Sequence, residues 1–186
     1  MNIANVLTTS RIALTIVFLL FVVQTGFQAK LIAALVFLAA SITDYLDGYL
    51  ARKYNLVTNY GKLMDPIADK FLVLSAFAVF GKLEVIPFWM VLIIFIREVA
   101  LTFYRLVAVF QGNILAAENL GKWKTVLQMG TLFIILFFVV FRETPIGENL
   151  TEFSLQAWHT SIYSLMILTV LLTVISALSY FKHYVR

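Results

Sequence analysis

The sequence has no cysteine and few charged residues, and both shortages restrict what the protein can be. Without cysteine there is no disulfide framework, no thiol nucleophile and no cysteine-based zinc site. Charged residues make up 13 % of the 186 residues, about half their usual share in soluble domains. Hydrophobic residues make up 62 %, and the mean hydropathy is +0.94. This composition excludes a disordered chain, which needs low hydrophobicity, and a soluble domain, which could not cover so much apolar surface.

The apolar residues form six segments, each near the length of about 20 residues that a helix needs to cross a bilayer. We expect an all-α integral membrane protein with six transmembrane helices and short connections. The spans are predicted at about 7–24, 31–51, 61–80, 87–110, 123–141 and 155–181. Residues 1–186 are then one transmembrane domain, with no room for a separate soluble domain.

The distribution of basic residues predicts the orientation of these spans. An even number of spans places both termini of the chain on one side of the membrane. Most basic residues lie near the ends of the spans on that side. The outer connections carry Lys30, Lys82 and Arg142. Because basic residues are retained on the cytoplasmic side, we expect cytoplasmic termini in the inner membrane. The net charge of +4 is explained by this bias without a nucleic-acid partner.

Ionisable residues within the spans gather toward the inner ends. Each costs roughly 2.5–3.5 kcal/mol at the centre of a membrane helix, unless it is paired, hydrated or bound to an ion. One polar cavity open to the cytoplasm would accommodate all of them. They are Asp44 and Asp47, Asp65 and Asp69, Arg97, Glu98 and Arg105, and Lys122 and Lys124.

The four aspartates form two pairs with helical spacing. Asp44 and Asp47 are three residues apart and Asp65 and Asp69 are four apart, so each pair shares one helix face. Four ionised carboxylates in one cavity repel unless some are protonated or cations neutralise them. Oxygen ligands favour Mg²⁺ or Mn²⁺, and two such ions suit in-line phosphoryl displacement. The alternative is a set of structural acid–base pairs, such as Asp44 with Arg52.

The segment from Asp44 to Asp69 reads DYLDGYLARKYNLVTNYGKLMDPIAD. It resembles the signature of the CDP-alcohol phosphatidyltransferase family, D-x2-D-G-x2-A-R-x8-G-x3-D-x3-D. All eight fixed positions match: Asp44, Asp47, Gly48, Ala51, Arg52, Gly61, Asp65 and Asp69. The segments NVLTTSR, RKYNLVTNYGKLMDPIADK, REVALTFYR and GKWKT are similar to the branch of that family that makes phosphatidylglycerophosphate in bacteria.

The resemblance implies roles for particular residues. Asp44, Asp47, Asp65 and Asp69 would hold two Mg²⁺ ions, or Mn²⁺, and Asp69 is also the candidate general base. Residues expected to bind the CDP group are Asn5, Thr8, Arg11, Gly48, Ala51, Arg52 and Gly61. Residues expected to bind the phosphate of the acceptor are Arg97, Arg105, Lys122, Lys124 and Thr125.

The reaction implied by the resemblance joins the phosphatidyl group of CDP-diacylglycerol to sn-glycerol 3-phosphate and releases CMP. The family also implies a homodimer. Cardiolipin synthase and phosphatidylinositol-phosphate synthase branches remain open, because both use acidic acceptors. A cationic acceptor suits the basic residues poorly. An ion transporter is the alternative from another class, since intramembrane acids are typical of ion paths.

Overall fold

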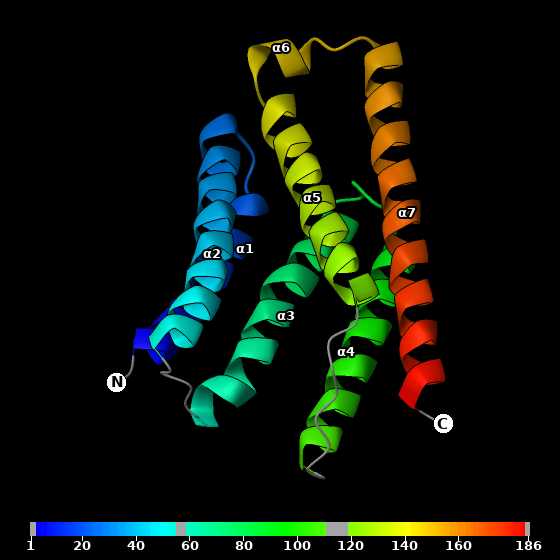
Figure 1. Ribbon diagram of the computed structural model, residues 1–186. Helices are drawn as coiled ribbons and strands as arrows, with labels where there is room; N and C mark the ends of the chain where they lie inside the picture. Colours follow the sequence, from blue (N-terminus) through cyan, green and yellow to red (C-terminus); the bar gives the residue numbers. More distant parts are fainter. Residues whose placement is uncertain (1–2, 55–58, 111–118, 185–186) are drawn as a thin grey trace. The chain divides into compact units, whose positions relative to one another are not determined.

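The computed structural model describes residues 3–54, 59–110 and 119–184, and for some of these, among them 47–54 and 59–66, only the backbone. All regular structure in these ranges is helical (Figure 1). The helices are α1 (Ile3–Val22), α2 (Phe27–Tyr54), α3 (Asn59–Lys82), α4 (Phe88–Phe110), α5 (Asn119–Arg142), α6 (Pro145–Glu148) and α7 (Glu152–Tyr184).

The six predicted spans correspond to the six long helices, and the short helix α6 was not predicted. By length and hydropathy, three segments of the described chain qualify as membrane spans: Phe27–Asp44, Trp123–Arg142 and Glu152–Ser179. Helices α3 and α4 carry charged residues within their length, and the apolar stretch of α1, Thr8–Val22, is shorter than these three. The all-helical fold is confirmed, whereas six spans and a cytoplasm-facing cavity stay predictions.

The described chain divides into two compact units. The first comprises Met1–Val79 and Leu136–Leu150. Within it α1 packs against α2, and the buried rings of Phe18 and Phe37 lie 5.3 Å apart between their centroids. The connection turns at Gly26, whose φ of +98° suits glycine because a Cβ disfavours that region.

The second unit comprises Phe80–Ile135 and Thr151–Arg186. Here α4 packs against α7, and the buried core includes Met90, Ile94 and Met166. Helix α3 ends in a Schellman cap, because Val85 N donates to Phe80 O at 3.0 Å.

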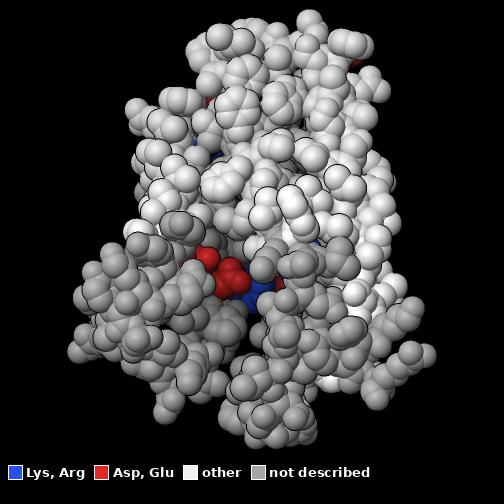
Figure 2. Space-filling view, viewed as in Figure 1, with Lys and Arg blue, Asp and Glu red and all other residues white. Residues whose placement is uncertain are grey.

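Large apolar side chains are exposed along several helices of both units, including Phe103, Phe137 and Phe153. Figure 2 shows that most of the described surface on the viewed face is free of charged side chains. Such a surface would be unusual facing water but is the expected one facing lipid. The apolar helices therefore indicate a membrane protein.

Candidate active site

Asp44 lies on α2 and is paired with Arg11 of α1. Arg11 Nη1 lies 2.8 Å from Asp44 Oδ1, with the Arg11 side chain 1 % exposed and that of Asp44 45 % exposed. Thr8, one turn before Arg11, is also buried. A predicted CDP-binding residue, Arg11, thus contacts a predicted metal ligand, Asp44, and Thr8 shares the face of α1 that carries Arg11. The side chain of Arg52, named above as a partner for Asp44, lies outside the described part.

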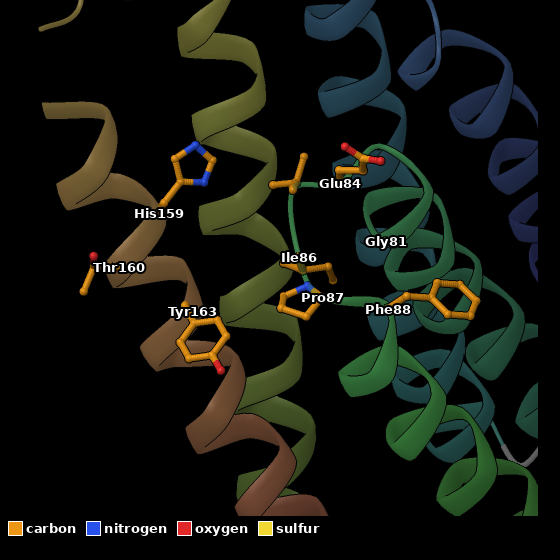
Figure 3. Close-up of a pocket in the computed structure, with 9 residues that line it drawn as sticks. Gly81, Glu84, Ile86, Pro87, Phe88, His159, Thr160 and Tyr163 are labelled. Carbon is orange, nitrogen blue, oxygen red and sulfur yellow. The ribbon is translucent and has the colours of Figure 1, made fainter. Parts of the chain in front are cut away.

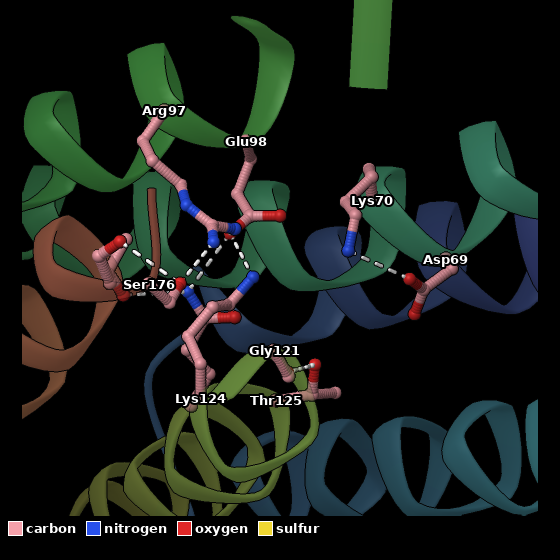
Figure 4. Close-up of polar contacts among 10 residues, drawn as sticks. Asp69, Lys70, Arg97, Glu98, Gly121, Lys124, Thr125 and Ser176 are labelled. Carbon is pink, nitrogen blue, oxygen red and sulfur yellow. Dashed lines mark hydrogen bonds and ion pairs between the residues drawn. The ribbon is translucent and has the colours of Figure 1, made fainter. Parts of the chain in front are cut away.

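Asp69 lies on α3, where its neighbour Lys70 contacts it. Lys70 Nζ lies 3.0 Å from Asp69 Oδ2, and the two side chains are 25 % and 34 % exposed (Figure 4). A carboxylate that bears on proton transfer must be reachable by substrate, and the partial exposure of Asp69 meets that requirement.

The structure leaves much of the predicted site undescribed. Both aspartate pairs lie within one helix each, α2 and α3. In the part whose side chains are described, no group of three potential metal ligands occurs. The four-carboxylate cluster therefore stays a prediction. The predicted site residues that are described by their backbone alone are Asn5, Asp47, Gly48, Ala51, Arg52, Gly61, Asp65, Arg105 and Lys122.

Two of the predicted acceptor-binding cations meet at the carboxylate of Glu98 (Figure 4). Arg97 Nη1 donates to Glu98 Oε1 at 2.9 Å, and Lys124 Nζ donates to the same oxygen. Glu98 and Lys124 are 2 % and 3 % exposed. The sequence interpretation placed Glu98 among the ionisable residues of the predicted cavity but gave it no part in binding or catalysis. The signal that could have found it is an acid directly beside a predicted phosphate-binding arginine.

Thr125 does not take part in these contacts. It is exposed, and its hydroxyl donates to Gly121 O of its own helix at 3.1 Å. Because adjacent helical residues point about 100° apart, Lys124 and Thr125 lie on different faces of α5. The structure therefore joins Arg97 with Lys124, and it leaves Thr125 apart from them.

A cavity of about 620 Å³ lies elsewhere in the second unit (Figure 3). It opens between the α3–α4 turn, with Ile86 and Pro87, and the α7 residues His159, Thr160 and Tyr163. None of the predicted site residues whose side chains are described lines it.

Comparison with known proteins finds a family profile and relatives that agree with the resemblance described above. The profile of the CDP-alcohol phosphatidyltransferase family matches residues 1–177. The CDP-diacylglycerol–glycerol-3-phosphate 3-phosphatidyltransferase of Bacillus subtilis is 43 % identical over 136 residues, covering 67 % of this chain and 70 % of the relative. The protein of the same name from Rickettsia bellii is 35 % identical over 182 residues, covering 97 % and 94 %. A probable phosphatidylglycerophosphate synthase of Mycobacterium tuberculosis is 34 % identical over 188 residues, covering 100 % and 82 %.

Proposed function

Because the chain belongs to the CDP-alcohol phosphatidyltransferase family, we propose that it transfers the phosphatidyl group of CDP-diacylglycerol to sn-glycerol 3-phosphate. The products are phosphatidylglycerophosphate and CMP. The observation that carries this proposal is that relatives from different bacteria have the same name, CDP-diacylglycerol–glycerol-3-phosphate 3-phosphatidyltransferase. The relative from Rickettsia bellii matches 97 % of this chain.

The charge around Glu98 supports an acidic acceptor. Among the described side chains, Arg97 and Lys124 contribute two positive charges and Glu98 one negative charge, so these three residues together carry +1. A buried positive charge attracts a phosphate more strongly than it would in water, because the local dielectric constant is lower. An acceptor that carries a phosphate fits this charge, and a cationic alcohol does not.

The family implies a divalent cation, and the chemistry of the donor set fits one. The predicted ligands are carboxylates, and the two that are described, Asp44 and Asp69, are partly exposed rather than sealed in apolar surroundings. Carboxylate oxygens suit Mg²⁺ or Mn²⁺. We propose that Asp44, Asp47, Asp65 and Asp69 hold two Mg²⁺ ions. When bound, these ions would offset the charge of the diphosphate and of the departing CMP.

The residues of the chain are proposed to bind both substrates and move one proton. Asp69 accepts the proton of the acceptor hydroxyl. The hydroxyl oxygen forms a bond to the β-phosphorus of CDP-diacylglycerol, the bond from that phosphorus to the bridging oxygen breaks, and CMP leaves. Arg11 and Arg52 hold the CDP group, because guanidinium donors match phosphate oxygens. Arg97, which is 13 % exposed, and Lys124, which is 3 % exposed, hold the acceptor once the packing around Glu98 opens to admit its phosphate.

The arrangement in the membrane is part of the same proposal. We place the chain in the inner membrane as a homodimer, with both termini in the cytoplasm. In this orientation the inner ends of the spans face water-soluble glycerol 3-phosphate and CMP. The acyl chains of the lipid donor stay in the bilayer.

The proposed function is tested by the release of CMP from CDP-diacylglycerol. The purified chain in detergent is incubated with Mg²⁺ and, in parallel, with glycerol 3-phosphate, phosphatidylglycerol or inositol phosphate. Release with glycerol 3-phosphate alone, abolished by a chelator and restored by Mg²⁺, is expected. Release with another acceptor only would refute the acceptor assignment, and release that a chelator leaves unchanged would refute the metal assignment.

A further inference from the structure

The carboxylate of Glu98 is a point of convergence within the second unit. Three donors from two helices reach its Oε1 atom: Arg97 Nη1 at 2.9 Å, Lys124 Nζ, and Gln128 Nε2 at 3.5 Å. Glu98 is also almost fully buried. A buried carboxylate is tolerated only with compensating charges and hydrogen bonds, and this one receives both.

Helix α7 contacts two of the residues that donate to Glu98, namely Arg97 and Gln128, and Figure 4 shows Ser176 of α7 beside Arg97. Arg97 Nη2 donates to Ser176 Oγ, and Gln128 Nε2 lies 3.5 Å from Thr173 Oγ1. Arg97 therefore contacts both Glu98 and α7, and Gln128 links Glu98 to α7. The Glu98 cluster, comprising Arg97, Glu98, Lys124, Gln128 and Ser176, is fixed by α4, α5 and α7 together.

Uncharged polar residues on α5 and α7 extend the contact between these two helices beyond the Glu98 cluster. On α5, Lys124, Gln128 and Thr131 are separated by four and three residues and share one face. On α7, Thr169, Thr173 and Ser176 follow the corresponding spacing. Thr131 and Thr169 contact each other at 3.0 Å between their hydroxyl oxygens. This uncharged pair provides a matched control, because it links α5 and α7 without touching Glu98.

We propose that Glu98 is a positioning residue that orients Arg97 and Lys124 toward the phosphate of the acceptor. The inference rests on the proposed function, and it adds a residue to which neither the sequence nor the relatives' names assign a role. Lysine and arginine have long side chains that adopt many conformations when unrestrained. A carboxylate that holds both removes that freedom before the substrate arrives, so less ordering is needed on binding.

The alternative to positioning is a purely electrostatic role, and the two make opposite predictions for Glu98→Gln. This variant keeps the shape of the side chain and raises the charge of the Glu98 cluster from +1 to +2. If only charge mattered, an anionic acceptor would bind more tightly and its KM would fall. If Glu98 positions the cations, the acceptor KM rises by about tenfold or more, as for loss of a charge-assisted contact.

The experiment measures KM for each substrate and the melting temperature in detergent for the wild type, Glu98→Gln and Thr131→Val. The expected result is a raised acceptor KM in Glu98→Gln alone, with the KM for CDP-diacylglycerol changed less than about twofold. An acceptor KM equal to or below that of the wild type overturns the inference. Equal rises in both variants also overturn it, because they indicate a general packing effect.

A second measurement keeps the inference testable if Glu98→Gln does not fold. Glu98→Asp retains the charge but retracts the carboxylate by one methylene, so the acceptor KM must still rise. An unchanged KM in Glu98→Asp overturns the positioning role.

The behaviour of the wild type in the turnover assay distinguishes a failure of this inference from a failure of the proposed function. If the wild type uses another acceptor, the acceptor assignment fails, and the same comparison is made with that acceptor. If it shows no turnover, inorganic phosphate is titrated while the melting temperature is followed. A stabilisation by phosphate that is lost in Glu98→Gln supports the positioning role, and equal or absent stabilisation in both proteins overturns it.

Discussion

The contact between Arg11 and Asp44 couples a predicted CDP-binding residue to a predicted metal ligand, and its strength can be bounded from the structure. The atoms Arg11 Nη1 and Asp44 Oδ1 are 2.8 Å apart, and the two side chains are 1 % and 45 % exposed. Breaking a fully buried ion pair costs about 3–5 kcal/mol, and an exposed pair contributes about 0.2–1 kcal/mol. Because one partner is half-exposed, we expect Arg11→Met to cost about 1–3 kcal/mol, between these two cases.

A double-mutant cycle measures this contact. Arg11→Met, Asp44→Asn and the double variant are compared by thermal unfolding in detergent, and a coupling energy of at least about 1 kcal/mol is expected. The kcat/KM for CDP-diacylglycerol should fall in each single variant. Thr15→Val is the control, since Thr15 donates to the backbone oxygen of Arg11 and not to the charged pair. Additive losses of stability would refute the coupling.

Three further substitutions test separate features. Asp69→Asn should lower turnover by about 100-fold or more with little change in melting temperature; near wild-type turnover would exclude Asp69 as the base. Glu84 has a φ of 59°, so Glu84→Gly should stabilise the protein by about 1 kcal/mol; an unchanged or lower melting temperature would contradict this relief of strain. A Cβ on Gly147 would overlap the carbonyl oxygen of Phe141 and lie 2.7 Å from Arg142 Cα. Gly147→Ala should therefore cost about 2 kcal/mol or more in unfolding experiments, and wild-type stability would show that α6 can shift at little cost.

The long helices could be predicted because apolar runs of this length have few other structures available. The short helix α6 was missed because it lies in the connection between two predicted spans, 123–141 and 155–181, where no helix was expected. A local signal was nevertheless present. Thr144 caps the helix, with Gly147 N donating to its hydroxyl at 3.1 Å, and Pro145 occupies the first helical position.

The family and the identities of the candidate site residues could be predicted because the signature fixes residue types at fixed spacing. The partners of those residues could not be predicted in the same way. Asp44 contacts Arg11 across two helices, and Glu98 receives Lys124 from another helix. Such contacts depend on the rotation and register of packed helices, which spacing within one helix does not determine.

The central claim is that this chain makes phosphatidylglycerophosphate. The most direct test is mass spectrometry of the lipid formed from CDP-diacylglycerol and isotopically labelled glycerol 3-phosphate by the purified wild type. The account predicts a labelled lipid with the mass of phosphatidylglycerophosphate, formed in equal amount to CMP. CMP release without label in the lipid, or no lipid product from folded protein supplied with Mg²⁺ or Mn²⁺, would contradict it.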